Sequence, residues 1–215
     1  MTFDSRDKGF SLIEVVLAIG IFLVTVLVLV GMLGPTLESV EEVDKTDEIV
    51  SVIDSVSAFL NGGSDFGQNV ASFDIIYETI LTGGYSTIYV YRSYLSANSS
   101  DVKLSVGFSP SERTSTQRIS TRSRAFDFKN AAGRIYRCVL TVKPLLPRQY
   151  YKDRGRRAFP RYLLTNKISE FNEGYLPIEV AIYAENPGPS FSDRISIRDL
   201  SSKEPDYVFN TAISR

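Results

Sequence analysis

The chain has 215 residues, of which 43% are hydrophobic and 23% charged, and its formal net charge is -1. A chain of this length and composition can fill the core of one domain. The absence of histidine excludes an imidazole base, a Ser-His-Asp triad and a histidine-ligated metal. The single cysteine, Cys138, excludes an intrachain disulfide, and we expect it to be a buried strand residue.

An uncharged segment near the N-terminus is long enough to cross a membrane once. Residues 15–33 carry no charge, and a helix over residues 10–33 would span ~36 Å, compared with a hydrocarbon core of ~30 Å. No Ala-x-Ala pattern follows the segment, so we expect it to be retained. Arg6 and Lys8 precede it and acidic residues follow it, which predicts a cytoplasmic N-terminus and a periplasmic or extracellular location for everything after Pro35.

A short motif stands directly before the uncharged segment. It reads Gly9-Phe10-Ser11-Leu12-Ile13-Glu14, so one carboxylate lies at the edge of an otherwise uncharged membrane helix. A carboxylate at the centre of such a helix costs roughly 2.5 to 3.5 kcal/mol, and less near the interface, so it usually marks an ion pair or a function. The alternative is a plain signal anchor in which Glu14 lies at the cytoplasmic interface by accident.

These six residues, behind a short charged leader, resemble the type III signal of type IV prepilins. The resemblance implies that a prepilin peptidase cuts between Gly9 and Phe10, removes residues 1–9 and leaves Phe10 as an N-methylated terminus. The new amine and Glu14 would be four residues apart on one helix face, so Glu14 could pair with its own terminus or with that of a neighbouring subunit. The implied partners are the peptidase, other pilin or pseudopilin subunits, an inner-membrane assembly platform and membrane lipid.

Two features narrow the resemblance to a minor pseudopilin or minor pilin of a type II secretion or type IV pilus-like filament. The two-cysteine loop found near the C-terminus of many adhesive pilins is missing, and the chain is longer than most major pseudopilins. The stretches 17–21 and 31–36 also resemble the pilin-like Verru_Chthon cassette proteins. The resemblance implies a single-pass protein of the cytoplasmic membrane that later enters a filament.

The helical pattern continues beyond Pro35. Apolar residues recur every three or four positions as far as Leu60, seven acidic residues stand between them, and the pattern ends at Asn61-Gly62-Gly63. One helix is therefore predicted from about Phe10 to about Leu60. Residues 10–35 would form its transmembrane half and residues 36–61 its exposed amphipathic half.

From Asp74 onward the pattern changes from helical to alternating, which predicts strands. The strand candidates, separated by Gly, Pro and Asn turn signals, are 87–95, 102–108, 134–142, 177–184 and 207–213. The expected fold is α+β and type IV pilin-like, with a long N-terminal helix packed on an antiparallel sheet, and residues 62–215 would form the globular head domain.

Basic residues concentrate in two clusters of the head domain, because residues 109–161 hold fourteen Lys or Arg and only three Asp or Glu. The first cluster is Arg113, Arg118, Arg122 and Arg124, and the second, with three aromatic residues among it, is Arg148, Lys152, Arg154, Arg156, Arg157 and Arg161. These residues could form a solvated surface, bind the acidic helix of a neighbouring subunit or bind nucleic acid. Of the two functional interpretations, we favour binding to the acidic helix of a neighbouring subunit.

No cofactor and no catalytic residue is expected. A calcium site near the C-terminus would draw on Asp193, Asp199, Glu204 and Asp206, but their spacing matches no recognisable calcium loop, and solvated turns are the simpler interpretation. A membrane-anchored enzyme is the competing class. The chain has no Gly-x-Ser-x-Gly, phosphate-binding loop or Cys-x-x-Cys motif, so only carboxylate, lysine or serine chemistry would be open to it.

Overall fold

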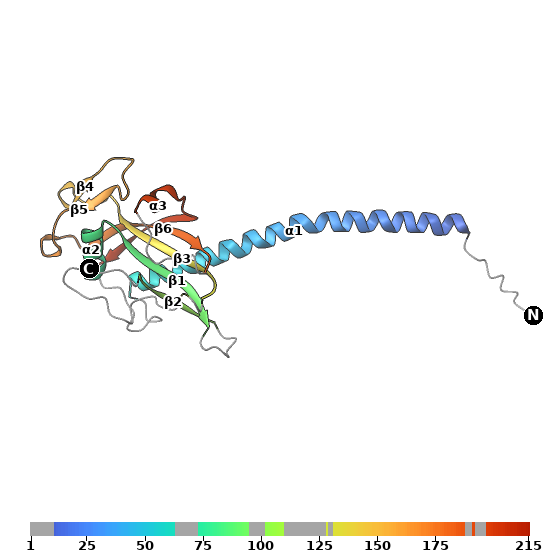
Figure 1. The fold of residues 1–215 in the computed structure, drawn as a ribbon, viewed down its shortest axis with the longest axis horizontal. Helices are drawn as coiled ribbons and strands as arrows, with labels where there is room; N and C mark the ends of the chain where they lie inside the picture. The colour runs from blue at the N-terminus through green and yellow to red at the C-terminus, as the bar shows by residue number, and fades with distance from the viewer. Residues whose placement is uncertain are drawn as a thin grey trace, which may run out of the picture. The chain divides into compact units, whose positions relative to one another are not determined.

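The structure is a computed structural model that describes residues 11–62, 73–94, 102–109, 128, 131–187, 191 and 197–215. The chain divides into two compact units, Met1–Glu48 and Ile49–Arg215, which we call the N-terminal unit and the head unit. Helix α1, Leu12–Leu60, begins in the first unit and ends in the second (Figure 1). Its bounds lie within two residues of the predicted helix.

In the N-terminal unit α1 exposes apolar side chains along its whole membrane-length segment. Residues Leu12–Gly34 form a helical stretch that is long and apolar enough to cross a membrane, and none of it is buried. The helix satisfies its own backbone hydrogen bonds, as lipid requires, and the Thr25 hydroxyl donates to the Ile21 carbonyl at 2.8 Å. The helix also continues without interruption through Gly34 and Pro35.

The head unit is built on one antiparallel sheet of five strands in the order β2-β1-β3-β6-β7. The strands are β1 (Ser86–Tyr94), β2 (Val102–Phe108), β3 (Ala131–Val142), β6 (Tyr175–Glu185) and β7 (Tyr207–Ser214). All five predicted strands are confirmed, and none of their ends moves by more than three residues. The expected α+β fold, with a long N-terminal helix and an antiparallel sheet, is therefore confirmed.

One face of the sheet, the inner face, carries the main core. The last turns of α1 bury Val52, Val56 and Phe59 in the same cluster as the strand residues, and the rings of Phe59 and Phe108 meet at 5.5 Å between centroids. Cys138 lies in this core, as predicted, and its complete burial raises the pKa of the thiol.

The prediction of an alternating pattern from Asp74 onward was wrong for the first part of that region, which forms helix α2, Phe73–Gly83. Its buried residues Phe73, Ile76, Tyr77 and Ile80 follow the three-and-four spacing of a helix face. The first strand candidate began only at Thr87, and no helix was predicted in this short segment. Burial raises the pKa of Tyr77 to about 12, so this side chain stays a neutral donor to the Asn166 carbonyl, at 2.9 Å.

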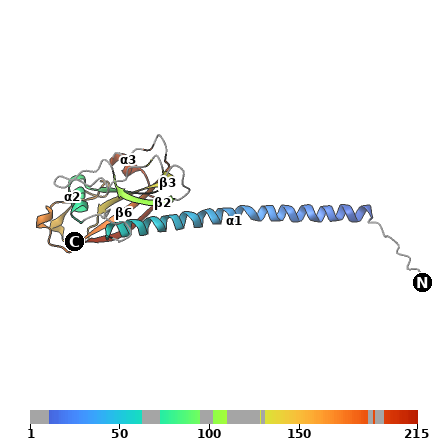
Figure 2. The ribbon, with the colours of Figure 1, turned by 90° about the horizontal axis from the view of Figure 1, so that it is seen from below.

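The other face of the sheet, the outer face, is partly covered by the short helix α3, Ile197–Ser202. Its Leu200 packs with Val139, Ala181 and Tyr183, so α3 and the last turns of α1 lie on opposite sides of the sheet (Figure 2). The short strands β4 (Tyr151–Asp153) and β5 (Tyr162–Leu164) pair in a separate hairpin. The 3-10 helices η4 (Arg148–Tyr150) and η5 (Ile168–Glu170) flank this hairpin in the chain.

An arginine is buried on the outer face. Arg137 is 2% exposed and donates to both carboxylate oxygens of Glu185, through Nε at 3.0 Å and through Nη2 at 2.8 Å. Its Nη1 donates to the Tyr89 hydroxyl, and its guanidinium lies 4.9 Å from the centroid of the Tyr89 ring. The buried charge is therefore paired and hydrogen-bonded, as burial of a charge requires.

Candidate functional site

The first turn of α1 carries the described part of the predicted processing motif. The Glu14 amide donates to Ser11 Oγ at 3.3 Å, and the Ser11 amide donates to Glu14 Oε2, also at 3.3 Å. This reciprocal pair is a capping box, in which two amide groups at the start of the helix find acceptors. Glu14 thus has a local structural role that the sequence analysis missed, although the Ser-x-x-Glu spacing is its recognised signal.

Gly9 and Phe10, the predicted cleavage-site residues, lie outside the described residues. Phe10 directly precedes Ser11, whose amide donates a hydrogen bond to the Glu14 carboxylate. A terminal amine created at Phe10 would therefore be one residue away from this amide. The capping box presents the carboxylate toward the end of the helix where the new charge would arise.

The second basic cluster lies on the β4–β5 hairpin and on η4 directly before it, and all six of its cations are exposed. We call these residues the basic hairpin: Arg148, Lys152, Arg154, Arg156, Arg157 and Arg161. Arg161 pairs with Asp153 at 3.1 Å, and the hydrogen bond from its guanidinium holds the pKa of the Asp153 carboxyl below its usual value. Among the described residues, Lys152, Arg156 and Arg157 form no ion pair. The first basic cluster, residues 113–124, lies outside the described residues.

The aromatic residues interleaved with the basic hairpin face inward. Tyr150 is buried and meets Phe171 at 5.0 Å between ring centroids. Tyr151 is only partly exposed and packs edge-on against Tyr162 at 5.5 Å. These rings stabilise the base of the hairpin, and their role in the structure is packing rather than the display of open faces for bases.

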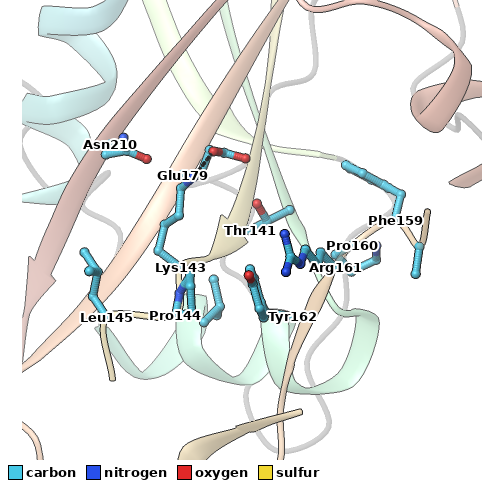
Figure 3. A pocket seen from close by; sticks show the side chains of 12 residues that line it. Thr141, Lys143, Pro144, Leu145, Phe159, Pro160, Arg161, Tyr162, Glu179 and Asn210 are labelled. Carbon is cyan, nitrogen blue, oxygen red and sulfur yellow. Dashed lines mark ion pairs between the residues drawn. The ribbon is translucent and has the colours of Figure 1, made fainter. Parts of the chain in front are cut away.

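A pocket of about 570 Å³ lies between the basic hairpin and the outer face of the sheet (Figure 3). Its sheet side holds Thr141, Glu179 and Asn210, which are neighbours across β3, β6 and β7. Lys143 extends along the same side and forms an ion pair with Glu179. The hairpin side is lined by Ala158, Phe159, Pro160, Arg161 and Tyr162, with Pro144 and Leu145 also at the wall. No local sequence pattern predicts this pocket, because its residues come from four separate segments.

The acidic residues considered for calcium do not converge in the part of the chain that the structure describes. Asp206 uses its carboxylate to accept a hydrogen bond from the Ala184 amide at 2.7 Å, and Asp199 lies in α3. No three Cys, Asp or Glu side chains among the described residues are grouped as metal ligands. The fourth candidate, Asp193, lies outside the described residues.

Comparison with known proteins bears on the N-terminal region. Residues 4–30 match the model of the prokaryotic N-terminal methylation motif. No curated protein and no solved structure matches the chain. The match covers residues 4–9 of the predicted leader, the capping box and most of the apolar part of α1, so the functional interpretation of the head unit depends on its own geometry.

Proposed function

We propose that this chain is a type IV pilin-like precursor that a prepilin peptidase processes for assembly with other pilin subunits. Within that class it would be a minor pseudopilin or minor pilin of a type IV pilus-like or type II secretion filament. The observation that carries the proposal is the methylation motif at residues 4–30 placed directly on a 49-residue helix. Its apolar, exposed first half fits a bilayer. The fold of the head unit is of the α+β class expected for such subunits.

In this proposal the peptidase cuts between Gly9 and Phe10 at the cytoplasmic face of the inner membrane. A glycine before the cleaved bond leaves the backbone extended and unhindered, outside the helix. The head unit then lies in the periplasm or outside the cell, since Arg6 and Lys8 precede the apolar segment. The motif supports a structural subunit rather than an enzyme, and the one carboxylate in the pocket, Glu179, is paired with Lys143.

Glu14 would act twice in this scheme. Its carboxylate caps the helix through Ser11, and after cleavage it would also pair with the amine of Phe10 or with the corresponding amine of a neighbouring subunit. An ion pair between subunits would set the stagger of successive subunits in the filament. The capping box supports this pairing, because it holds the Glu14 carboxylate at the N-terminal end of the helix.

The basic hairpin would contact the acidic part of α1 in another subunit. Residues 36–48 hold six acidic residues and one lysine, so the two surfaces have opposite charge and would steer assembly. Binding of nucleic acid to the same cations is the second candidate function, favoured only by their exposure and number.

The experiment that tests the proposal is expression of the precursor with and without a prepilin peptidase, followed by N-terminal sequencing of the product. We expect Phe10 as the terminus when the peptidase is present. An intact Met1 in its presence would refute the proposal.

Three variants, each expressed with the peptidase and followed for both cleavage and entry into filaments, separate the two roles of Glu14. Glu14→Ala removes both charge and cap, Glu14→Gln keeps an acceptor for the cap but removes the charge, and Ser11→Ala weakens the cap but keeps the charge. We expect all three to be cleaved, and only Ser11→Ala to enter filaments. Normal assembly of Glu14→Gln would show that the charge pair is not required.

A further inference from the structure

The pocket beside the basic hairpin has donor groups that its internal ion pairs leave unused. Lys143 and Arg161 are 31% and 42% exposed, and each is paired with one carboxylate. Arg161 uses Nε and Nη2 on Asp153, so its Nη1 is left over, and an ammonium group such as that of Lys143 has three N–H donors. Both cations can therefore accept one more anionic partner.

Neutral polar groups in the pocket also lack partners. Within the described part of the chain, the side chains of Thr141 and Asn210 and the hydroxyl of Tyr162 make no hydrogen bond. They line the pocket together with the two cations and Glu179 (Figure 3). A small set of converging polar groups against apolar walls is the usual composition of a binding pocket.

The charge balance favours an anionic ligand with one negative charge. The pocket lining contains two cations and one carboxylate, and Asp153, which pairs with Arg161, is the one carboxylate in the basic hairpin segment, residues 148–161. A single carboxylate could approach Lys143, Arg161 and Asn210, whereas a dianion would meet about twice the repulsion from Glu179. Leu145, which is 68% exposed, offers an apolar surface next to this position.

The pocket does not suit nucleic acid. A base would need an open aromatic face, but the guanidinium of Arg161 lies 4.8 Å from the centroid of the Tyr162 ring. Phe159 packs against Tyr85 at 6.3 Å between ring centroids. A peptide carboxylate next to an apolar side chain matches the remaining surface better.

We propose that this pocket binds a carboxylate side chain from the acidic part of α1, residues 38–48, of another copy of this chain. That segment combines the required groups, because Val40 and Val43 are exposed and Asp44 and Asp47 follow them by one helical turn. A valine and an aspartate on one face would meet Leu145 and the two cations respectively. The proposal rests on the proposed function, and it names the residues that receive the neighbouring helix.

The test is the binding of a fluorescent peptide with the sequence of residues 36–50 to the full-length precursor in detergent, followed by fluorescence anisotropy. This measurement requires neither cleavage nor filaments, so its failure is distinguishable from failure of the proposed function. Lys143→Gln should weaken binding about fivefold, and Glu179→Gln should strengthen it by a similar factor, since the two changes shift the pocket charge in opposite directions. Asn210→Leu, which changes no charge, should weaken it by obstructing the pocket.

The matched control is Lys103→Gln, which removes one exposed charge on β2, outside the basic hairpin and the pocket, and should change affinity by less than about twofold at physiological salt. Equal weakening by Lys103→Gln and Lys143→Gln would overturn the proposal, because the net charge of the head unit would then explain the binding. A peptide with amides in place of its acids that binds equally well would overturn it too. Displacement of the peptide by single-stranded DNA of equal charge at equal concentration would assign the surface to nucleic acid instead. Near-ultraviolet circular dichroism of each variant checks that the head unit is folded.

Discussion

Two glutamates on β6 show how strongly the surroundings of a residue decide what its ion pair contributes to stability. Glu185 is 14% exposed and holds the buried Arg137 through two hydrogen bonds, with Lys203 as a second cation at 3.4 Å. Glu179, six residues earlier, pairs with Lys143 at a half-exposed position. The first pair lacks the solvent that screens the second, so removing one partner leaves a charge that the interior cannot hydrate.

We predict that Glu185→Gln destabilises the head unit by about 3–5 kcal/mol, because it leaves the Arg137 guanidinium buried without its counter-ion. The melting temperature, followed by near-ultraviolet circular dichroism of the full chain in detergent, should fall by about 10 °C. The same substitution at Glu179 is the control and should lower it by less than about 3 °C. Similar losses for both variants would contradict the assignment of Arg137–Glu185 as the pair on which the outer face depends.

At the scale of elements, the turn between α2 and β1 depends on a glycine conformation. Gly84 follows the last helical residue with φ +81°, and its amide donates to the Ile80 carbonyl at 2.7 Å, which closes the end of the helix. A Cβ atom at this position would lie 2.8 Å from side-chain atoms of both Leu163 and Pro160. The hairpin therefore packs directly on this turn, and α2 is held between β1 and β5.

Gly84→Ala should destabilise the head unit by about 1–2 kcal/mol, since a left-handed conformation disfavours a side chain and the space is occupied. The neighbouring Gly83→Ala is the control, because a Cβ there meets nothing within 4 Å and alanine favours a helix. Thermal unfolding of both variants gives the comparison. A Gly84→Ala variant as stable as Gly83→Ala would show that the turn adapts.

In the molecule as a whole, the two units suit different surroundings. The N-terminal unit exposes an apolar helix surface and matches a bilayer in length, whereas the head unit has a core of its own drawn from residues 52–213. That core joins the end of α1, α2 and the inner face of the sheet. We propose that the head unit holds together by this packing without a resident metal.

Calcium removal tests this proposal. The melting temperature of the full chain should be the same in excess EDTA and in millimolar calcium chloride, because Asp206 already caps the Ala184 amide and the described acidic residues form no ligand group. A calcium-dependent rise of more than about 5 °C would establish a site that includes residues outside the described ranges.

Features that depend on neighbouring residues follow from local sequence patterns. The extent of α1 followed from an uncharged stretch and a three-and-four period, and the five strands of the sheet followed from alternation between turn signals. The Ser11–Glu14 capping box and the helical spacing of α2 are present in the same local pattern, but an ion pair at Glu14 and an alternating pattern from Asp74 compete with them.

Contacts between residues far apart in the chain follow from the folded structure and from no local pattern. Arg137 looks like one more member of a basic region in the sequence, yet the pairing of β3 with β6 brings Glu185 to it and buries it. The carboxylate of the pocket, Glu179, comes from β6, and its neighbours come from β3, β7 and the hairpin. Such contacts depend on strand order and register, and these are set by the packing of the whole core rather than by any local pattern. The methylation motif at residues 4–30 supports processing as a prepilin, and the proposed partner surface depends on the folded head unit.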